Sequence, residues 1–321
     1  MTKKILANDG IDNQGKALLE KAGFTVITEK VEQENLASAI NENNYVALTV
    51  RSATKVRKDI IDACPKLKLI GRGGVGMDNI DVEYAKSKGV EVVNTPAASS
   101  MSVAELVFAH LFSMVRFLYD SNREMPLSGD VEFDALKKKY APGIELRGKT
   151  LGIIGFGRIG QAVATTGLGL GMKILAYDPF IPEAEINLFI HGASPVSIKI
   201  KTVSMEEVLK NCDFITLHVP GGKVITSKEI AHMKKGAGIV NASRGGVIDE
   251  NDLLEALNSG KLAFAGLDVF ENEPKPRMDL LMHPKVSLTP HIGAATLEAQ
   301  ERIGIELAEK IVNFLSIKLM F

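Results

Sequence analysis

The sequence has 321 residues, of which 45% are hydrophobic and 24% are charged, and its formal net charge at pH 7 is −1. This length allows two ordinary globular domains, and the near-neutral charge argues against nucleic acid or an anionic membrane as a partner, because both attract basic proteins. No apolar run approaches membrane-spanning length. The two cysteines, Cys64 and Cys212, have no metal-binding or redox spacing, so we expect no metal site and a cytoplasmic location.

The first third of the chain alternates between strand-like and helix-like segments. Strands are predicted at 3–9, 24–28, 45–50, 66–71 and 90–94, with helices at 13–23, at 34–43 and from 81 onward. This rhythm is typical of a parallel sheet covered by helices on both faces. A long apolar helix is predicted at 103–118, and the capping box formed by Ser102 and Glu105 marks its start.

A polar, irregular stretch is expected over 120–149, after which the alternation resumes. Strands are predicted at 150–155, 173–177, 214–220, 236–243, 263–269 and 286–290, with helices after the first strand, at 249–260 and at 296–315. The sequence therefore predicts two doubly wound α/β domains, with boundaries near residues 100 and 295. The stretch 181–203 is expected to have only a structural role.

The motif G-x-G-x-x-G occurs twice, at 71–76 and at 155–160. A dinucleotide loop lies between a strand and a helix whose N-terminus meets the pyrophosphate, and an acidic residue about 20 positions on binds the ribose. The second loop meets both requirements, since a helix can follow it and Asp178 ends the next strand. No helix opens at the first loop, and Asp78 would repel a pyrophosphate there. The second loop is therefore predicted to bind NAD, which Asp178 favours over NADP because a carboxylate repels a 2′-phosphate.

The first glycine loop has two interpretations. Consecutive glycines after a strand can form a nest of N–H groups that binds an anion, and both Arg72 in the loop and Arg51 after the strand at 45–50 would lie at carboxyl strand ends, where ligands bind. Alternatively, Gly73 and Gly74 only turn the chain and the two arginines are solvated. The residues by themselves favour the two interpretations equally.

Hydride transfer between a carbinol and a carbonyl needs a proton donor or acceptor near the oxygen and a cation for the substrate carboxylate. His218 and His291 both follow predicted strands of the second domain, whereas His110 lies among apolar helix residues, where a packed or hydrogen-bonded histidine is expected. Arg244 follows another strand, and Glu273 could orient an imidazole. This spacing makes Arg244, Glu273 and His291 a plausible catalytic trio.

Several motifs in a fixed order resemble the NAD-dependent D-2-hydroxyacid dehydrogenase family over nearly the whole chain. They are RSATKV, GRGGVGMDNID, GKTLGIIGFGRIG, YDP, NASRGGVIDENDLLEAL, GLDVFENEP and TPHIGAAT. The resemblance implies a Rossmann NAD-binding domain at 99–295, inserted in a flavodoxin-like substrate domain formed by 1–98 and 296–321. It also implies a homodimer that pairs through the NAD domain and binds a small anionic 2-hydroxy or 2-keto acid.

The resemblance implies a role for each member of the trio and for two aspartates. Arg244 is expected to bind the substrate carboxylate and carbonyl, His291 to exchange the proton, and Glu273 to hold and charge His291. Asp268 is expected to orient the nicotinamide amide, and Asp178 to bind the adenosine ribose. Further NAD contacts are implied for Val75, Gly155, Gly157, Arg158, Ile159, Gly160, Pro179, His218, Val219, Pro220, Ala242, Ser243, Arg244, His291, Gly293 and Ala294. Substrate contacts are implied for Arg51, Ser52, Arg72, Gly73, Gly74 and Val75, together with Arg244 and His291.

The expected reaction is the interconversion of 3-phospho-D-glycerate and 3-phosphohydroxypyruvate in serine biosynthesis. The alternative within the family is reduction of glyoxylate or hydroxypyruvate, and an NAD-sensing binding protein is the alternative outside enzymology. The stretch 221–230 is shorter than in most relatives, so one usual cofactor contact is not carried over. The sequence ends without the C-terminal regulatory domain that many relatives carry, so we expect L-serine to have little effect on the rate.

Overall fold

The computed structural model describes residues 3–317, and the chain divides into two compact units. Unit 1 comprises 1–99 together with 294–321, and unit 2 comprises 100–293. Of the predicted domain termini, residues 1–2 and 318–321 lie outside the described part of the chain. Substrate binding by unit 1 and NAD binding by unit 2 are predictions that the division of the chain does not test.

Unit 1 is built on a five-stranded parallel sheet in the order β2-β1-β3-β4-β5. This is the flavodoxin-like order of doubly wound sheets. Its strands are β1 (Lys4–Ala7), β2 (Thr25–Ile27), β3 (Tyr45–Val50), β4 (Leu69–Arg72) and β5 (Glu91–Asn94). Its helices are α1 (Asn13–Lys21), η1 (Gln33–Asn35), α2 (Leu36–Asn43), α3 (Lys58–Ala63), α4 (Val82–Ser87) and α13 (Leu297–Ile317). The predicted alternation of strands and helices is confirmed here.

The C-terminal helix α13 returns to unit 1 and packs against α1. A Cβ on Gly15 would lie 2.4 Å from the carbonyl oxygen of Gly304, so two glycines allow the helix backbones to approach this closely. Leu307 and Ile311 of α13 are buried in one apolar cluster with Ile5 of strand β1. The last helix is therefore part of the core of unit 1, although most of that unit precedes it by about 200 residues.

Unit 2 contains a six-stranded parallel sheet in the order β13-β12-β11-β10-β6-β7. Its strands are β6 (Thr150–Ile154), β7 (Lys173–Tyr177), β10 (Phe214–Leu217), β11 (Ala237–Asn241), β12 (Leu262–Leu267) and β13 (Val286–Leu288). Its helices beside this sheet are α5 (Ser100–Val115), α8 (Arg158–Gly169), α9 (Met205–Asn211), α10 (Ser227–His232), α11 (Glu250–Asn258) and α12 (Met278–Leu281). The strand order reverses between β6 and β10, which is the position where doubly wound sheets bind nucleotides.

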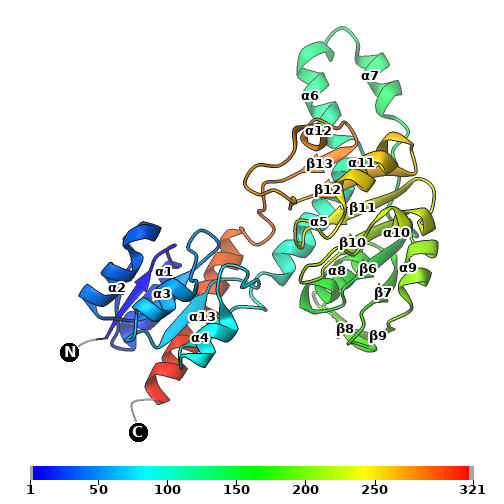
Figure 1. The fold of residues 1–321 in the computed structure, drawn as a ribbon. Coiled ribbons are helices and arrows are strands. Elements are labelled where there is room, and N and C mark those ends of the chain that lie inside the picture. Colours follow the sequence, from blue (N-terminus) through cyan, green and yellow to red (C-terminus); the bar gives the residue numbers. More distant parts are fainter. Residues whose placement is uncertain (1–2, 318–321) are drawn as a thin grey trace. The chain divides into compact units, whose positions relative to one another are not determined.

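The prediction of an irregular stretch at 120–149 was wrong. Two helices, α6 (Leu118–Ser128) and α7 (Phe133–Tyr140), project from the rest of unit 2 (Figure 1). No described residue of α6 is buried and only Leu136 is buried in α7, so these helices contribute little to the core of unit 2. The prediction that a capping box of Ser102 and Glu105 marks the start of α5 was also wrong, because the helix begins at Ser100 and Ser102 lies inside its first turn.

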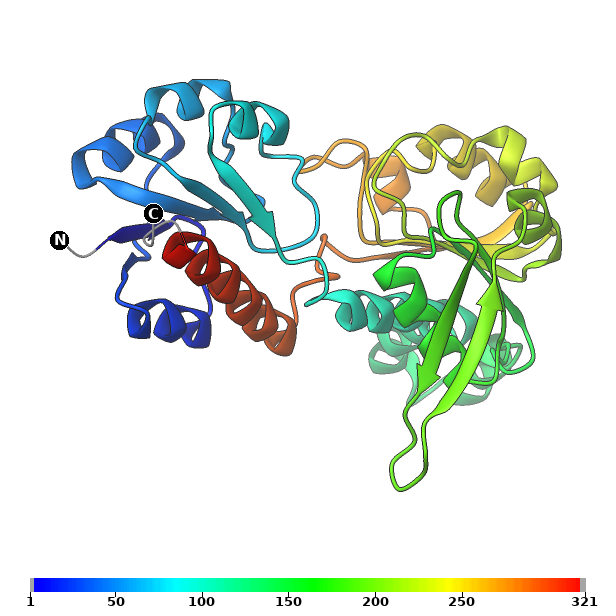
Figure 2. The same ribbon diagram turned by 90° about the horizontal axis from the view of Figure 1, so that it is seen from below.

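The segment after β7 forms an antiparallel hairpin of β8 (Glu183–Leu188) and β9 (Val196–Lys201). Figure 2 shows this green hairpin extending beyond the six-stranded sheet. Its apolar face packs on the rest of unit 2 through Ile186 and Ile200, which are both buried. No single described helix is long and apolar enough to span a membrane, and only the pair α5–α6, bent by 53°, meets the length and composition test together.

Candidate active site

Several of the predicted site residues of unit 2 follow three neighbouring strands of its sheet. Arg244 follows β11, Asp268 follows β12 and His291 follows β13. The pairings of β11 with β12 and of β12 with β13 are parallel and in register at these ends. The carboxyl ends of the three strands therefore bring residues that are up to 47 positions apart in sequence to one edge of the sheet.

His291 and Glu273 form the predicted pair. Nδ1 of His291 lies 2.8 Å from Oε2 of Glu273, and the two side chains are 50% and 35% exposed. A carboxylate accepts but does not donate, so Nδ1 carries a proton and Nε2 is the ring nitrogen left for another group. The second carboxylate oxygen of Glu273 accepts the backbone N–H of Phe270 at 2.9 Å, which fixes its orientation.

Asp268 holds the backbone on which His291 is presented. The Asp268 carboxylate is 1% exposed, and its oxygens accept the backbone N–H groups of Ile292 and Gly293, each at 2.8 Å. His291 has φ 55°, a left-handed conformation that few residues other than glycine adopt. The two hydrogen bonds directly after His291 stabilise this unusual turn.

The turn that carries Arg244 is organised by Asn241, the last residue of β11. The Asn241 side-chain oxygen accepts from the backbone N–H and the hydroxyl of Ser243, while its amide nitrogen donates to the carbonyl of Arg244. A Cβ on Gly245 would lie 1.8 Å from the carbonyl of Phe270, so this position requires glycine. The turn therefore packs directly against the segment that leads to Glu273.

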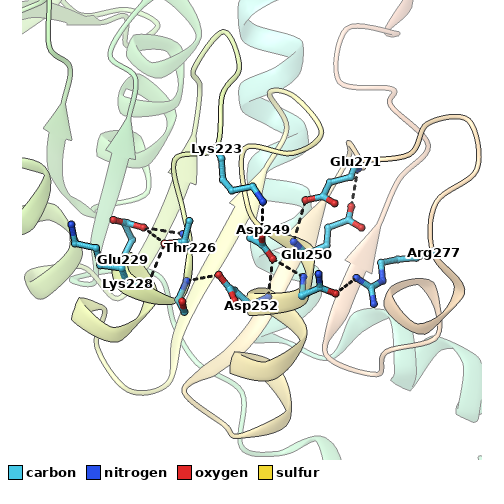
Figure 3. Close-up of polar contacts among 11 residues, drawn as sticks. Lys223, Thr226, Lys228, Glu229, Asp249, Glu250, Asp252, Glu271 and Arg277 are labelled. Carbon is cyan, nitrogen blue, oxygen red and sulfur yellow. Dashed lines mark hydrogen bonds and ion pairs between the residues drawn. The ribbon is translucent and has the colours of Figure 1, made fainter.

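A polar network at the start of α11 braces the segment 270–277 (Figure 3). The carboxylate of Glu250 accepts the backbone N–H of Glu271 at 2.8 Å, and Glu271 accepts the N–H of Glu250 in return at 3.4 Å. Arg277 donates to the side-chain oxygen of Asn251 at 2.6 Å. Glu250 is 5% exposed, and burial raises the pKa of its carboxyl. These contacts fix both ends of the segment that contains Glu273.

A cavity of about 430 Å³ adjoins this pair in unit 2. His291 and Glu273 line it, together with apolar residues from the segments before each of them. The lining residues are Phe270, Glu273, Pro274, Pro276, Leu281, Leu288, Thr289, Pro290 and His291. The imidazole–carboxylate pair therefore stands at the border of a mostly apolar recess.

The second glycine loop has the geometry of a dinucleotide cradle. Gly155 has φ 94°, and a Cβ there would lie 2.4 Å from the carbonyl of His218. A Cβ on Gly160 would lie 2.2 Å from the carbonyl of Gly155, whereas one on Gly157 would meet no described atom within 4 Å. No described side chain caps the N-terminus of α8 at Gly157. Its backbone N–H groups and positive dipole end are therefore available to an anion.

Asp178 lies against this loop, as its spacing predicts. Its carboxylate accepts the N–H groups of Phe156 at 2.8 Å, Phe180 at 2.8 Å and Ile181 at 3.1 Å. Carboxylate oxygens have about four acceptor sites, so capacity remains for a ribose hydroxyl. Pro179 follows directly, while His218, Val219 and Pro220 follow the neighbouring strand β10.

His218 is partly buried beside the glycine loop, and desolvation lowers the pKa of its imidazole to about 3. Its Nε2 lies 3.0 Å from the hydroxyl of Thr216. Ala242 and Ser243 are buried after β11, and Gly293 is the last residue of unit 2. The predicted contacts Val75 and Ala294 belong to unit 1.

The first glycine loop is arranged differently from the nest that the sequence allows. The N–H of Gly73 donates to the carbonyl of Val50 at 2.9 Å, and that of Gly74 donates to the hydroxyl of Thr95 at 2.7 Å. The nest interpretation is therefore wrong for these two glycines, which turn the chain. Within residues 3–317, no hydrogen bond from the N–H of Val75 or Gly76 is present. These two groups are the ones that this loop offers to an anion.

Arg51 and Arg72 lie at the ends of adjacent strands in unit 1, because Val50 pairs with Arg72 in the β3–β4 ladder. Asp9 holds the loop at 51–54 by accepting the N–H groups of Arg51 and Thr54 at 2.7 and 3.1 Å. Ser52 is exposed in this loop. Nη1 of Arg72 donates to the carbonyl of Gly73 at 2.9 Å.

Comparison with known proteins identifies the family. The sequence model of the D-isomer specific 2-hydroxyacid dehydrogenase NAD-binding domain matches residues 108–293. The chain is 45% identical to hydroxypyruvate reductase of Thermotoga maritima over 322 residues, which is 98% of this chain and 99% of the relative. It is 43% identical to D-3-phosphoglycerate dehydrogenase of Methanocaldococcus jannaschii over 316 residues, 97% of this chain but 57% of the relative.

The chain belongs to the D-2-hydroxyacid dehydrogenases. Its fold is similar to the NAD⁺-bound 3-phosphoglycerate dehydrogenase of Entamoeba histolytica, with a TM-score of 0.76 and 28% identity over 98% of this chain and 96% of that chain. This dehydrogenase therefore uses NAD as its cofactor, as predicted. The open space at Gly157 and the uncapped N-terminus of α8 fit a pyrophosphate, and the position of Asp178 fits a ribose.

Two polar residues near the site of the dehydrogenase were missed by sequence reasoning. Thr289 donates to Asp268 at 2.6 Å, and His110 of α5 lies 3.0 Å from the same threonine hydroxyl. Neither residue belongs to a motif that indicates chemistry. The only signal in the sequence is a histidine in an apolar helix, which correctly predicts that His110 is hydrogen-bonded but gives no partner.

Proposed function

We propose that the dehydrogenase interconverts 3-phospho-D-glycerate and 3-phosphohydroxypyruvate. The observation that carries this proposal is the pairing of β3 with β4, which places Arg51 and Arg72 on neighbouring strand ends of unit 1. A substrate with a carboxylate and a phosphate needs cations for both, and guanidinium groups match phosphate geometry. With Arg244 assigned to the reacting carboxylate, these two arginines are the candidates for the phosphate. The phosphoglycerate dehydrogenases among the relatives support this choice.

The residues of unit 2 would hold NAD as follows, and NAD when bound supplies or accepts the hydride. The loop at 155–160 and the N-terminus of α8 would bind the pyrophosphate, and Asp178 would bind the adenosine ribose. Asp268 would accept from the nicotinamide amide in addition to the Thr289 hydroxyl and the backbone N–H groups that it already binds. Pro179, His218, Val219, Pro220, Ala242, Ser243 and Gly293 border this cofactor site.

His291 exchanges the proton with the substrate oxygen. Its Nδ1 is engaged by Glu273, so the exchange takes place at Nε2. During reduction of a keto acid, Nε2–H donates its proton to the carbonyl oxygen, and during oxidation neutral Nε2 accepts the hydroxyl proton. Glu273 stabilises the imidazolium form in both directions, much as a buried aspartate does in a catalytic triad. Arg244 binds the carboxylate and the carbonyl oxygen, which stabilises the developing negative charge.

A second candidate is the reduction of unphosphorylated hydroxypyruvate or glyoxylate. The position of Arg72 favours it, because Nη1 of this side chain is already engaged by the Gly73 carbonyl and its guanidinium packs over Gly74. The relative from Thermotoga maritima, named hydroxypyruvate reductase, is 45% identical over 99% of its own length, against 43% over 57% for the phosphoglycerate dehydrogenase of Methanocaldococcus jannaschii. The chemistry at His291 and Arg244 is the same for both candidates.

The test compares kcat/KM for phosphohydroxypyruvate and hydroxypyruvate in the unmodified protein, Arg51→Ala and Arg72→Ala. A charge-assisted contact contributes about 1.5–3 kcal/mol, roughly ten- to a hundredfold in binding. Each substitution should therefore reduce kcat/KM for the phosphorylated acid far more than for hydroxypyruvate. Arg57→Ala is the matched control, because Arg57 pairs with Asp81 at 2.9 Å in the same unit. If the unmodified protein prefers hydroxypyruvate, the second candidate replaces the first.

We also propose that the dehydrogenase is a homodimer that pairs through unit 2. The projecting helices α6 and α7 and the turn between them carry exposed apolar residues, among them Leu127 at 82%, Val131 at 80% and Tyr119 at 62% exposure. Apolar side chains gathered on a projecting segment favour burial against another surface. Light scattering after size-exclusion chromatography measures the mass directly, and a monomer at micromolar concentration would contradict this proposal.

A further inference from the structure

We infer that His110 is a positioning residue that holds the His291 turn through Thr289 and Asp268. This inference rests on the proposed role of His291 but does not depend on which keto acid is reduced. His110 lies on α5, is 2% exposed, and contacts neither the glycine loop nor the Glu273 pair by any described hydrogen bond. Its ring nitrogens instead contact the hydroxyls of Ser287 at 2.8 Å and Thr289 at 3.0 Å.

The direction of each hydrogen bond in this chain follows from the number of protons available. The Asp268 carboxylate only accepts, so the single hydroxyl proton of Thr289 is donated to it at 2.6 Å. The Thr289 oxygen must therefore accept from Nε2–H of His110. A neutral ring then leaves Nδ1 as an acceptor for the hydroxyl of Ser287. Burial lowers the pKa of His110, which favours this neutral ring.

Asp268 connects this chain to the catalytic turn. Oδ1 of Asp268 accepts both the Thr289 hydroxyl and the N–H of Ile292, and Oδ2 accepts the N–H of Gly293. The segment from Thr289 to Gly293 is thus tied to one carboxylate on both sides of His291. A residue with φ 55° persists only where its surroundings over-determine it. The hydroxyl of Thr289, oriented by His110, is one of the three donors that provide this constraint.

The sheet provides the space for the His110 ring. Gly266 lies in β12, and a Cβ there would come within 2.8 Å of Cβ and 3.0 Å of Cγ of His110. The glycine therefore lets α5 approach the sheet closely enough for the imidazole to reach both hydroxyls near β13. An ordinary packed histidine would need neither this approach nor a hydroxyl on each ring nitrogen.

The tautomer is tested directly by NMR of the protein labelled with ¹⁵N-histidine, in which the ring nitrogen shifts show which nitrogen carries the proton. We expect the Nε2–H form of His110, whose ring signals are assigned by their absence from the spectrum of His110→Gln. Finding the Nδ1–H form would overturn the inference, since Thr289 could not then donate to Asp268 while accepting from His110. This measurement uses the unmodified chain and is independent of its substrate.

Kinetics test the connection to His291. Thr289→Val and His110→Leu should each lower kcat for glyoxylate or hydroxypyruvate reduction by about tenfold or more, while KM for the keto acid changes little. Because both act through one chain of hydrogen bonds, the double variant should lose no more than the worse single variant. His110→Gln keeps a donor near the position of Nε2 and should recover part of the rate.

Phe108→Leu is the matched control, because Phe108 is a buried residue of the same helix in the apolar core. It should lower Tm without lowering kcat. Provided that His291→Ala is inactive, either of two results would overturn the inference. One is a loss of kcat in the double variant that equals the product of the two single losses, and the other is a wild-type kcat in folded His110→Leu. If His291→Ala instead keeps its activity, the proposed role of His291 fails, and the two failures are thereby distinguished.

Discussion

Replacing Glu273 by glutamine removes the charge beside His291 with almost no change in size. The carboxylate uses one oxygen for Nδ1–H of His291 and the other for the N–H of Phe270. Glutamine has a single carbonyl oxygen, so it cannot accept from both donors. The variant therefore loses the stabilisation of the imidazolium together with one of the two contacts that orient the side chain.

The size of the effect follows from the geometry of the pair. A hydrogen bond to a charged group contributes about 1.5–3 kcal/mol, and the half-exposed side chains of His291 and Glu273 place this pair near the lower end because water screens it. At 1.36 kcal/mol per tenfold in rate, kcat should fall about ten- to thirtyfold. General acid–base catalysis contributes about 10²–10⁴-fold, so His291→Ala should lose more than Glu273→Gln.

The assay follows NADH absorbance during keto-acid reduction and, separately, during hydroxy-acid oxidation. Both directions should slow in Glu273→Gln, since the imidazolium is the proton donor in one and is formed in the other. Glu271→Gln is the matched control, because a glutamine there can still accept the N–H of Glu250. A wild-type kcat in both directions for Glu273→Gln would remove Glu273 from the mechanism, and a loss confined to KM for NAD would assign it to cofactor binding.

Three further predictions concern the cofactor cradle and the network at α11. Asp178→Ala should narrow the preference for NAD over NADP in kcat/KM, and equal use of both cofactors by the unmodified protein would refute the ribose assignment. Gly155→Ala should lower Tm by several degrees, because φ of Gly155 is 94° and a Cβ there would lie 2.4 Å from the His218 carbonyl. A Cβ on Gly157 would meet no described atom within 4 Å, so Gly157→Ala should leave Tm unchanged but weaken NAD binding in a fluorescence titration. Burial raises the pKa of Glu250, so its contribution to stability is complete below the ordinary glutamate pKa and is lost as the pH rises through the raised value. The Tm of Glu250→Gln should therefore rise relative to that of the unmodified protein as the pH increases above the ordinary glutamate pKa of about 4, and a constant difference would contradict a buried, titrating carboxyl.

The sequence by itself determined the α/β class, the choice between the two glycine loops and the NAD cofactor. Each of these depends on local order along the chain. Alternating strands and helices report which faces are buried, and the distance from Gly160 to Asp178 is the length of one helix and one strand. The sequence failed at α6 and α7, because both helices are polar on average and Pro126 lies inside α6, where a proline normally argues against a helix.

Only the tertiary structure decided what the polar groups bind. The sequence allows Gly73 and Gly74 to form either an anion-binding nest or a turn. In the fold their N–H groups donate to the Val50 carbonyl and the Thr95 hydroxyl, which decides for the turn. His110 is separated from Thr289 by 179 positions, and they meet because α5 packs on the sheet to which β13 belongs. A hydrogen bond depends on distance and direction in space, and periodicity along the chain specifies which side of an element is buried but not which partner it meets there.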